Sequence, residues 1–147
     1  MTKISVSAVL ITKNAAPTLA TCLASVAFCD EILVVDSGST DDTVALAQRC
    51  GARVIQTHWR GFGLQKQFAV EQAAHDWVLC IDADERVSDR LQQSLKAALA
   101  DISAASSKPA FYAYRFARCN RFMGRYLRHG EGYPDWSLRC FNRHHAQ

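Results

Sequence analysis

The chain has 147 residues, of which 49% are hydrophobic, and its 17 Lys and Arg residues against 14 Asp and Glu give a net charge of +3. This apolar content excludes a disordered chain and suits a single folded domain. No apolar run reaches the roughly 18 residues that a membrane-spanning helix needs. The first residues also lack the features of a secretory signal. We therefore expect a cytoplasmic protein.

The six cysteines are scattered along the chain and form no C-x-x-C pair. This spacing argues against a zinc site and against a disulfide framework. We expect the cysteines to be buried thiols of the core.

Charge is divided unevenly along the chain. Residues 1–107 carry 9 Lys and Arg against 12 Asp and Glu, a net −3, whereas residues 108–147 carry 8 against 2, a net +6. A run of small residues before Pro109 is typical of a surface connection. We therefore divide the chain into an α/β part, 1–107, and a basic, aromatic part, 108–147, of the same domain. The second part favours an anionic partner.

Short runs rich in Val, Ile and Leu predict four buried strands. They lie at 5–11, 31–35, 53–57 and 77–81. After Pro109, aromatic residues at alternate positions of 111–116 predict a further strand, and 137–142 predicts another.

Helical patterns separate the four runs. The first helix is expected after Pro17, where apolar residues recur at helical spacing. Thr40 is expected to cap the second, Leu64 and Phe68 indicate a third that ends near residue 74, and Ser88 is expected to cap the fourth. Strands that alternate with helices predict an α/β fold, a Rossmann-like parallel sheet with helices on both faces. Ligands of such sheets bind beyond the carboxyl ends of the strands.

Two carboxylates, Asp82 and Asp84, follow the strand predicted at 77–81. Magnesium and manganese prefer a few carboxylates together with waters and substrate phosphate oxygens. A D-x-D triplet can also be solvated acids in a turn, but its position directly after a buried strand favours a divalent cation site.

Asp36 ends the strand predicted at 31–35. An acid at this place in a nucleotide-binding sheet can accept hydrogen bonds from a ribose or a base, and we favour that role. Ser39, Thr40 and Asp41 are expected to serve the turn and the helix start instead. Neither G-x-G-x-x-G nor a P-loop motif occurs, so dinucleotide and P-loop sites are excluded.

These motifs together resemble the family 2 glycosyltransferases of the GT-A fold. The resemblance is carried by the residues at 9–14, 34–41 and 82–84. Two further segments look like the bacterial branch that adds sugars to the lipopolysaccharide inner core. They are G-F-G-L-Q-K-Q-F-A at 61–69 and G-Y-P-D-W-S-L-R at 132–139.

The resemblance implies a nucleotide-sugar donor that lies across the strand ends. Thr12 and Asn14 would line the base and ribose pocket, and Asp36 would hydrogen-bond the nucleoside. Lys66 would face the base or the diphosphate. Asp82 would approach the ribose or the metal, and Asp84 would be the principal ligand of Mg²⁺ or Mn²⁺.

Two features depart from the family pattern. Gln67 stands where the family commonly has asparagine. Inverting transfer also needs a base, and the family's carboxylate base lies beyond the last strand predicted here. Glu131 and Asp135 are the only carboxylates after Asp101, and we assign the base to neither. We expect the chain to be truncated at its C-terminus.

The second part interleaves arginines with aromatic residues, a composition that suits phosphate and sugar rings or a lipid interface. We expect an acceptor or lipid surface here and a protein that is peripheral at the inner membrane. Its residues are Arg118, Arg121, Arg125, Asp135 and Trp136. The resemblance makes the acceptor a lipopolysaccharide core. No nucleic-acid motif accompanies the charge, so nucleic acid is not the expected partner, and a solvated basic edge is the simplest alternative.

Two other functions remain open. A phosphatase-like hydrolase could use Asp82 as nucleophile and Asp84 as acid, although Arg86 stands where that family has threonine. The chain could also be a fragment that binds nucleotide or anionic lipid without turnover.

Overall fold

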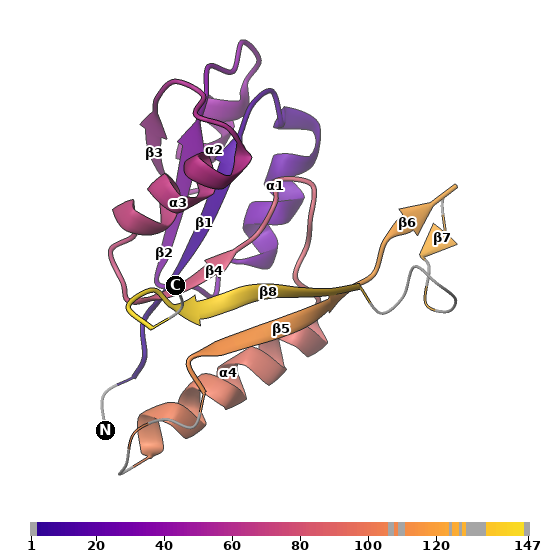
Figure 1. The fold of residues 1–147 in the computed structure, drawn as a ribbon. Coiled ribbons are helices and arrows are strands. Elements are labelled where there is room, and N and C mark those ends of the chain that lie inside the picture. Colours follow the sequence, from indigo (N-terminus) through magenta and orange to yellow (C-terminus); the bar gives the residue numbers. More distant parts are fainter. Residues whose placement is uncertain are drawn as a thin grey trace.

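The computed structural model describes residues 3–105, 108, 111–123, 125–126, 128 and 135–145. Its centre is a six-stranded sheet in the order β3-β2-β1-β4-β8-β5, with helices on both faces (Figure 1). The predicted α/β fold class is confirmed.

The parallel half of the sheet is built from strands and helices that alternate. The strands are β1 (Val6–Thr12), β2 (Glu31–Asp36), β3 (Arg53–Gln56) and β4 (Trp77–Cys80). The helices are α1 (Ala16–Ser25), α2 (Thr43–Arg49) and α3 (Phe62–Gln72). Because β1 pairs in parallel with both β2 and β4, the carboxyl ends of these three strands meet at one edge of the sheet.

The rest of the chain extends the sheet in the antiparallel sense. It contains α4 (Asp89–Ala104), β5 (Ala113–Arg118), β6 (Arg121–Phe122), β7 (Arg125–Tyr126) and β8 (Asp135–Asn142). Strand β8 lies between β4 and β5, so a strand of the basic part is hydrogen-bonded directly to the α/β part. Strands β6 and β7 form a separate hairpin.

Two apolar layers hold the helices to the sheet. On one face, residues of α1, α2 and α4 pack with the sheet, among them Leu19, Leu23 and Leu95. On the other, Ala69 and Ala73 of α3 pack against β1, β2 and β4. In the part of the chain that the structure describes, no helix combines the length and the apolar character needed to cross a bilayer.

The start of α2 differs from expectation. Thr40 does not cap this helix, which begins at Thr43 with Asp42 in the N-cap position. The backbone N–H of Thr40 donates instead to Oδ1 of Asn14, at 2.7 Å. Thr40 therefore belongs to a turn that wraps around the β1–α1 loop. Ser88 does cap α4, because its Oγ accepts a 3.1 Å hydrogen bond from the N–H of Leu91.

Three other expectations change in detail. The α3 helix forms, but Leu64 is 62% exposed and the buried residues are Gln65 and Ala69. Cys22 and Cys140 are buried and Cys29 and Cys80 are partly buried, but Cys50 and Cys119 are exposed, so the expectation that all cysteines are buried was wrong for these last two. Helix α4 continues through Ala104, so the connection expected at 103–109 begins later than predicted, and its residues 106, 107 and 109 lie outside the described residues.

Candidate functional site

Thr12 and Asp36 end neighbouring strands and pair in register across β1 and β2. The Asp36 side chain is buried, and its two oxygens accept four hydrogen bonds. The donors are the hydroxyls of Thr12 and Ser39 and the backbone N–H groups of Gly38 and Ser39. Burial alone would raise the pKa of Asp36, but these hydrogen bonds outweigh it and hold the pKa below its usual value.

Gly38 lets this turn form. Its φ is +96°, a conformation that costs glycine little and L side chains much more. The backbone N–H of Gly38 then points at Oδ2 of Asp36, at 3.1 Å.

Asn14 joins the β1–α1 loop to the β2–α2 loop. It adopts the left-handed conformation, with a φ of 51°. Its Oδ1 accepts hydrogen bonds from the backbone of Thr40 and Asp41, and its own N–H donates to Oγ of Ser39. Thr12, Asn14 and Asp36 are thus brought together at one end of the sheet, with Asn14 exposed and the other two buried.

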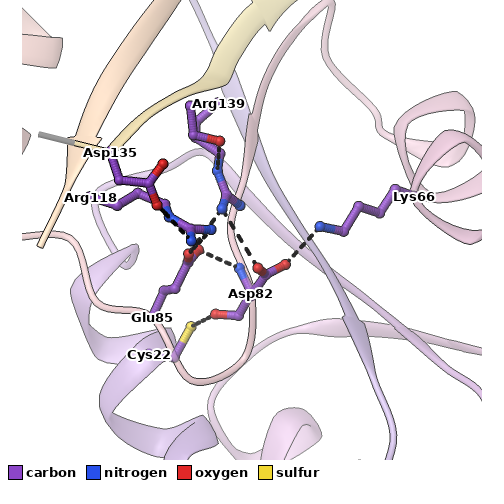
Figure 2. Close-up of polar contacts among 8 residues, drawn as sticks. Cys22, Lys66, Asp82, Glu85, Arg118, Asp135 and Arg139 are labelled. Carbon is purple, nitrogen blue, oxygen red and sulfur yellow. Dashed lines mark hydrogen bonds and ion pairs between the residues drawn. The ribbon is translucent and has the colours of Figure 1, made fainter. Parts of the chain in front are cut away.

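Asp82 lies just beyond the end of β4, between two cations (Figure 2). Oδ1 accepts a hydrogen bond from Nζ of Lys66 at 2.9 Å. Oδ2 lies 3.6 Å from Nη2 of Arg139. Burial raises the pKa of Asp82, but Lys66, Arg139 and Arg118 outweigh that effect, and the net pKa is lowered. Lys66, Ala69 and Asp82 also line a small hollow between α3 and the ends of β1 and β4.

Glu85 organises this end of the sheet, and we did not predict it. Its Oε2 accepts a 2.9 Å hydrogen bond from the backbone N–H of Asp82. Its Oε1 lies 2.9 Å from Nη2 of Arg139 and 3.4 Å from Nη1 of Arg118 (Figure 2). Glu85 therefore stabilises the D-x-D turn by a hydrogen bond and holds Arg118 and Arg139 next to it by ion pairs.

Asp84 has a different setting from Asp82. Its side chain is exposed. Within the described residues, no three His, Cys, Asp or Glu side chains are grouped as a metal cage would require. Magnesium and manganese nevertheless suit one or two carboxylates completed by waters and phosphate oxygens. The chemistry of the Asp82 and Asp84 pair fits such an ion.

The three acids that we expected to share a site lie at the same edge of the sheet in different environments. Asp36 is directed into its own turn, Asp82 is held between cations, and Asp84 is exposed. Gln67, the departure from the family pattern, is exposed and donates a hydrogen bond to Glu71 on its own helix. Its amide therefore lies on the exposed surface of α3.

The basic part is less uniformly open than its composition indicates. Arg118 donates to Asp135 through Nε at 3.0 Å and is only half-exposed. Arg139 is buried, and Arg143 donates to the last carbonyls of α3. Arg125 is exposed, and the Arg121 side chain lies outside the described part of the structure.

Exposed aromatic side chains lie beside another arginine of this part, Arg115. Trp136 is 58% exposed. It lines a shallow hollow of about 330 Å³ together with Phe111 and Arg115. Glu131 and residues 132–134 of the second family segment lie outside the described residues.

Comparison with known proteins decides the family. Residues 7–143 match the model of glycosyl transferase family 2. The chain belongs to this family. The six-stranded sheet flanked by helices is the GT-A architecture that the sequence motifs predicted.

Relatives of this family 2 chain include glycosyltransferases of bacteria. An uncharacterized glycosyltransferase of Rickettsia felis is 44% identical over 111 residues, which are 75% of this chain and 38% of the relative. The lipopolysaccharide core biosynthesis glycosyltransferase LpsC of Rhizobium meliloti is 40% identical over 121 residues, 79% of this chain and 43% of LpsC. The chain thus spans about two fifths of the length of these relatives.

A solved structure is also similar to this family 2 chain. It is glucosyl-3-phosphoglycerate synthase of Mycobacterium tuberculosis, in complex with Mn²⁺, uridine diphosphate and glucosyl-3-phosphoglycerate. The TM-score is 0.50 at 28% identity, over 56% of this chain and 36% of the synthase.

Proposed function

We propose that this chain is the donor-binding part of an inverting, metal-dependent glycosyltransferase. It would transfer a sugar from a nucleotide-sugar donor to a lipopolysaccharide core acceptor. The observation that carries the proposal is the Asp82 carboxylate, which lies between Lys66 and Arg139 and next but one to Asp84 at the carboxyl edge of the sheet. Carboxylates for a cation and cations for phosphate are what a nucleoside diphosphate and its metal require.

The nucleoside would lie at the ends of β1 and β2. Thr12 and Asn14 line this edge, and Asn14 is the exposed one. A hydrogen bond from the nucleoside to Asp36 requires one of its four present donors to leave. The Ser39 hydroxyl is the donor that can do so by rotation, because the other three are two backbone groups and the buried Thr12 hydroxyl.

Asp84 and Asp82 would hold Mg²⁺ or Mn²⁺. Such an ion neutralises the charge that grows on a departing nucleoside diphosphate. Lys66 would contact the diphosphate as a point charge. The complex of the mycobacterial relative with Mn²⁺ and uridine diphosphate supports a donor of this class.

The acceptor would approach over β5, β8 and the β6–β7 hairpin. Arg118, Arg121, Arg125, Asp135 and Trp136 are the residues that we propose for this surface, which could also contact anionic lipid. LpsC supports a lipopolysaccharide core acceptor. A transferase of this kind would work in the cytoplasm, peripheral to the inner membrane. We assign no catalytic base, because Asp135 and Glu85, two described carboxylates near this surface, are both ion-paired with Arg118.

The two rival functions fare differently. A phosphatase-like hydrolase would use Asp82 as nucleophile, yet Lys66 and Arg139 flank its two oxygens, and the chain belongs to a transferase family. Binding without turnover stays an alternative prediction, which the transfer assay below tests.

Calorimetry with uridine diphosphate tests the proposed donor site. The chain should bind the nucleotide, and Mn²⁺ should tighten that binding. Asp84→Ala should abolish the effect of Mn²⁺ without unfolding the protein, because Asp84 is exposed. Asp101→Ala, an exposed acid on α4, is the matched control. Equal affinities of wild type and Asp84→Ala in Mn²⁺ would refute the metal assignment.

A transfer assay with a nucleotide sugar and lipopolysaccharide core separates catalysis from binding. Sugar transfer would support the complete proposal. Nucleotide binding with no transfer would leave the non-catalytic alternative.

A further inference from the structure

We infer, on the basis of the proposed function, that Arg139 is a second phosphate-binding residue. Together with Lys66 it would clasp the diphosphate of the donor from the other side of Asp82. Glu85 would be the positioning residue that holds Arg139 in place.

The backbone of β8 delivers Arg139 to this point. Leu79 of β4 pairs with Cys140 of β8, so Arg139 comes next to the end of β4, where the D-x-D turn begins. The pairing of β8 with β5 shifts register at the same place: Tyr114 pairs with Cys140, whereas Arg115 pairs with Leu138. Arg139 is the extra residue of that shift. Irregularities of this kind re-aim a side chain and are common next to active sites.

The Arg139 guanidinium is fixed by hydrogen bonds from two of its three nitrogens. Its side chain is only 9% exposed, and a cation so far from water needs specific partners. Nε donates to Oγ of Ser137 at 2.9 Å, and Nη2 donates to Oε1 of Glu85 at 2.9 Å. Within the described part of the chain, these two nitrogens make the side-chain hydrogen bonds of Arg139, so the two N–H groups of Nη1 remain for a ligand.

The contact of Arg139 with Asp82 is an ion pair that a ligand can replace. The distance of 3.6 Å between Nη2 and Oδ2 is too long for a good hydrogen bond. Lys66 occupies the other oxygen, so two cations flank one carboxylate (Figure 2). A diphosphate carries more negative charge in total than this one carboxylate. Its oxygens would replace Asp82 as the partner of Lys66 and Arg139. The Asp82 carboxylate would then be free of both cations, next to Asp84.

The two cations offer complementary chemistry. The arginine fork can bind two oxygens of one phosphate, whereas the lysine acts as a point charge on the other. Glu85 keeps the fork oriented because it bonds both the guanidinium and the backbone N–H of Asp82. A nucleoside without phosphate would gain no binding affinity from Lys66 and Arg139.

The test compares uridine, uridine monophosphate and uridine diphosphate, each titrated by calorimetry with and without Mn²⁺. Arg139→Gln should weaken binding of the diphosphate by about 10- to 100-fold and leave uridine unchanged. Glu85→Gln should produce a smaller loss with the same selectivity. Arg53→Gln is the matched control, because Arg53 is ion-paired with Glu31 at the amino ends of β3 and β2, away from the proposed donor site.

Arg139→Lys keeps a positive charge beside Glu85 and covers the case in which Arg139→Gln does not fold. It should lose about 3- to 10-fold in diphosphate affinity, because the fork is gone. If the Arg139 variants lost equal affinity for uridine and uridine diphosphate, or kept their affinity for the diphosphate, the inference would be overturned while the proposed function would stand. Failure of the wild-type chain to bind uridine diphosphate would overturn the proposed function and the inference with it.

Discussion

The hydroxyl of Thr12 donates a 2.8 Å hydrogen bond to Oδ1 of Asp36 across the last rung of the β1–β2 ladder. Both residues are buried, so this bond joins the carboxyl ends of two strands beneath the loops that would receive the nucleoside. The Asp36 carboxylate also anchors the turn that follows β2. Asp36 is therefore a structural support of the site as well as a candidate for ligand contact.

Asp36→Asn should destabilise the fold by about 2–3 kcal/mol, because the amide nitrogen of asparagine cannot accept hydrogen bonds and leaves buried donors unsatisfied. Urea unfolding at neutral pH measures this loss. Asp42→Asn is the control, since Asp42 is exposed and makes no side-chain cap bond to α2. Equal stability of the two variants would show that the turn does not depend on the carboxylate.

Stability should fall in acid. The pKa values of Asp36 and Asp82 are both below normal in the folded protein. A group with a lowered folded pKa stabilises the protein above its unfolded pKa, and that contribution is lost as the pH falls through the folded pKa. Unfolding free energy should therefore be flat near neutral pH and decline below about pH 4. The decline should be shallower in Asp36→Asn, and an identical slope would contradict the assignment.

Much of the fold was readable from the chain because it rests on local patterns. The runs that became β1, β2 and β4 are rich in Val, Ile and Leu, as expected of strands covered on both faces, whereas the edge strand β3 has exposed polar residues at both ends. The D-x-D pair was predicted from its place after a buried strand and Lys66 from the family resemblance, and the structure brings Lys66 within 2.9 Å of Asp82, 16 residues further along the chain.

Long-range geometry was beyond such patterns. Glu85 had no signal of its own, since an acid next to a D-x-D pair looks like one more solvated charge. The role of Arg139 depends on the register shift in β8, and its position in a basic segment made it look exposed. The place of β8 between β4 and β5 decides both, and no local spacing encodes it.

Gln65→Met should stabilise the fold. Gln65 is fully buried in α3, and neither atom of its amide has a hydrogen-bond partner in the described structure. Because an unsatisfied buried group costs about 1–3 kcal/mol, a similar-sized apolar side chain should raise the unfolding free energy by about 1 kcal/mol or more. Gln67→Met, on the exposed face of the same helix, should change it by less than about 0.5 kcal/mol. A loss of stability in Gln65→Met would indicate that the amide is hydrogen-bonded to buried water.

Trp136→Ala combined with Arg125→Gln should weaken attachment to vesicles that contain anionic phospholipid. Trp136 is 58% exposed, and Arg125 is exposed on the β6–β7 hairpin. A basic residue near an anionic surface contributes about 1 kcal/mol, and that contribution is screened by salt. Co-sedimentation at low and high ionic strength measures the effect.

Arg118 provides the contrast within the same surface. Its guanidinium is already paired with Asp135 and Glu85, so Arg118→Gln should reduce vesicle binding less than Arg125→Gln does. Arg49→Gln, an exposed arginine at the end of α2, is the control for net charge. If Arg49→Gln reduced binding as much as Arg125→Gln, the attraction would come from overall charge and the proposed lipid surface would be wrong.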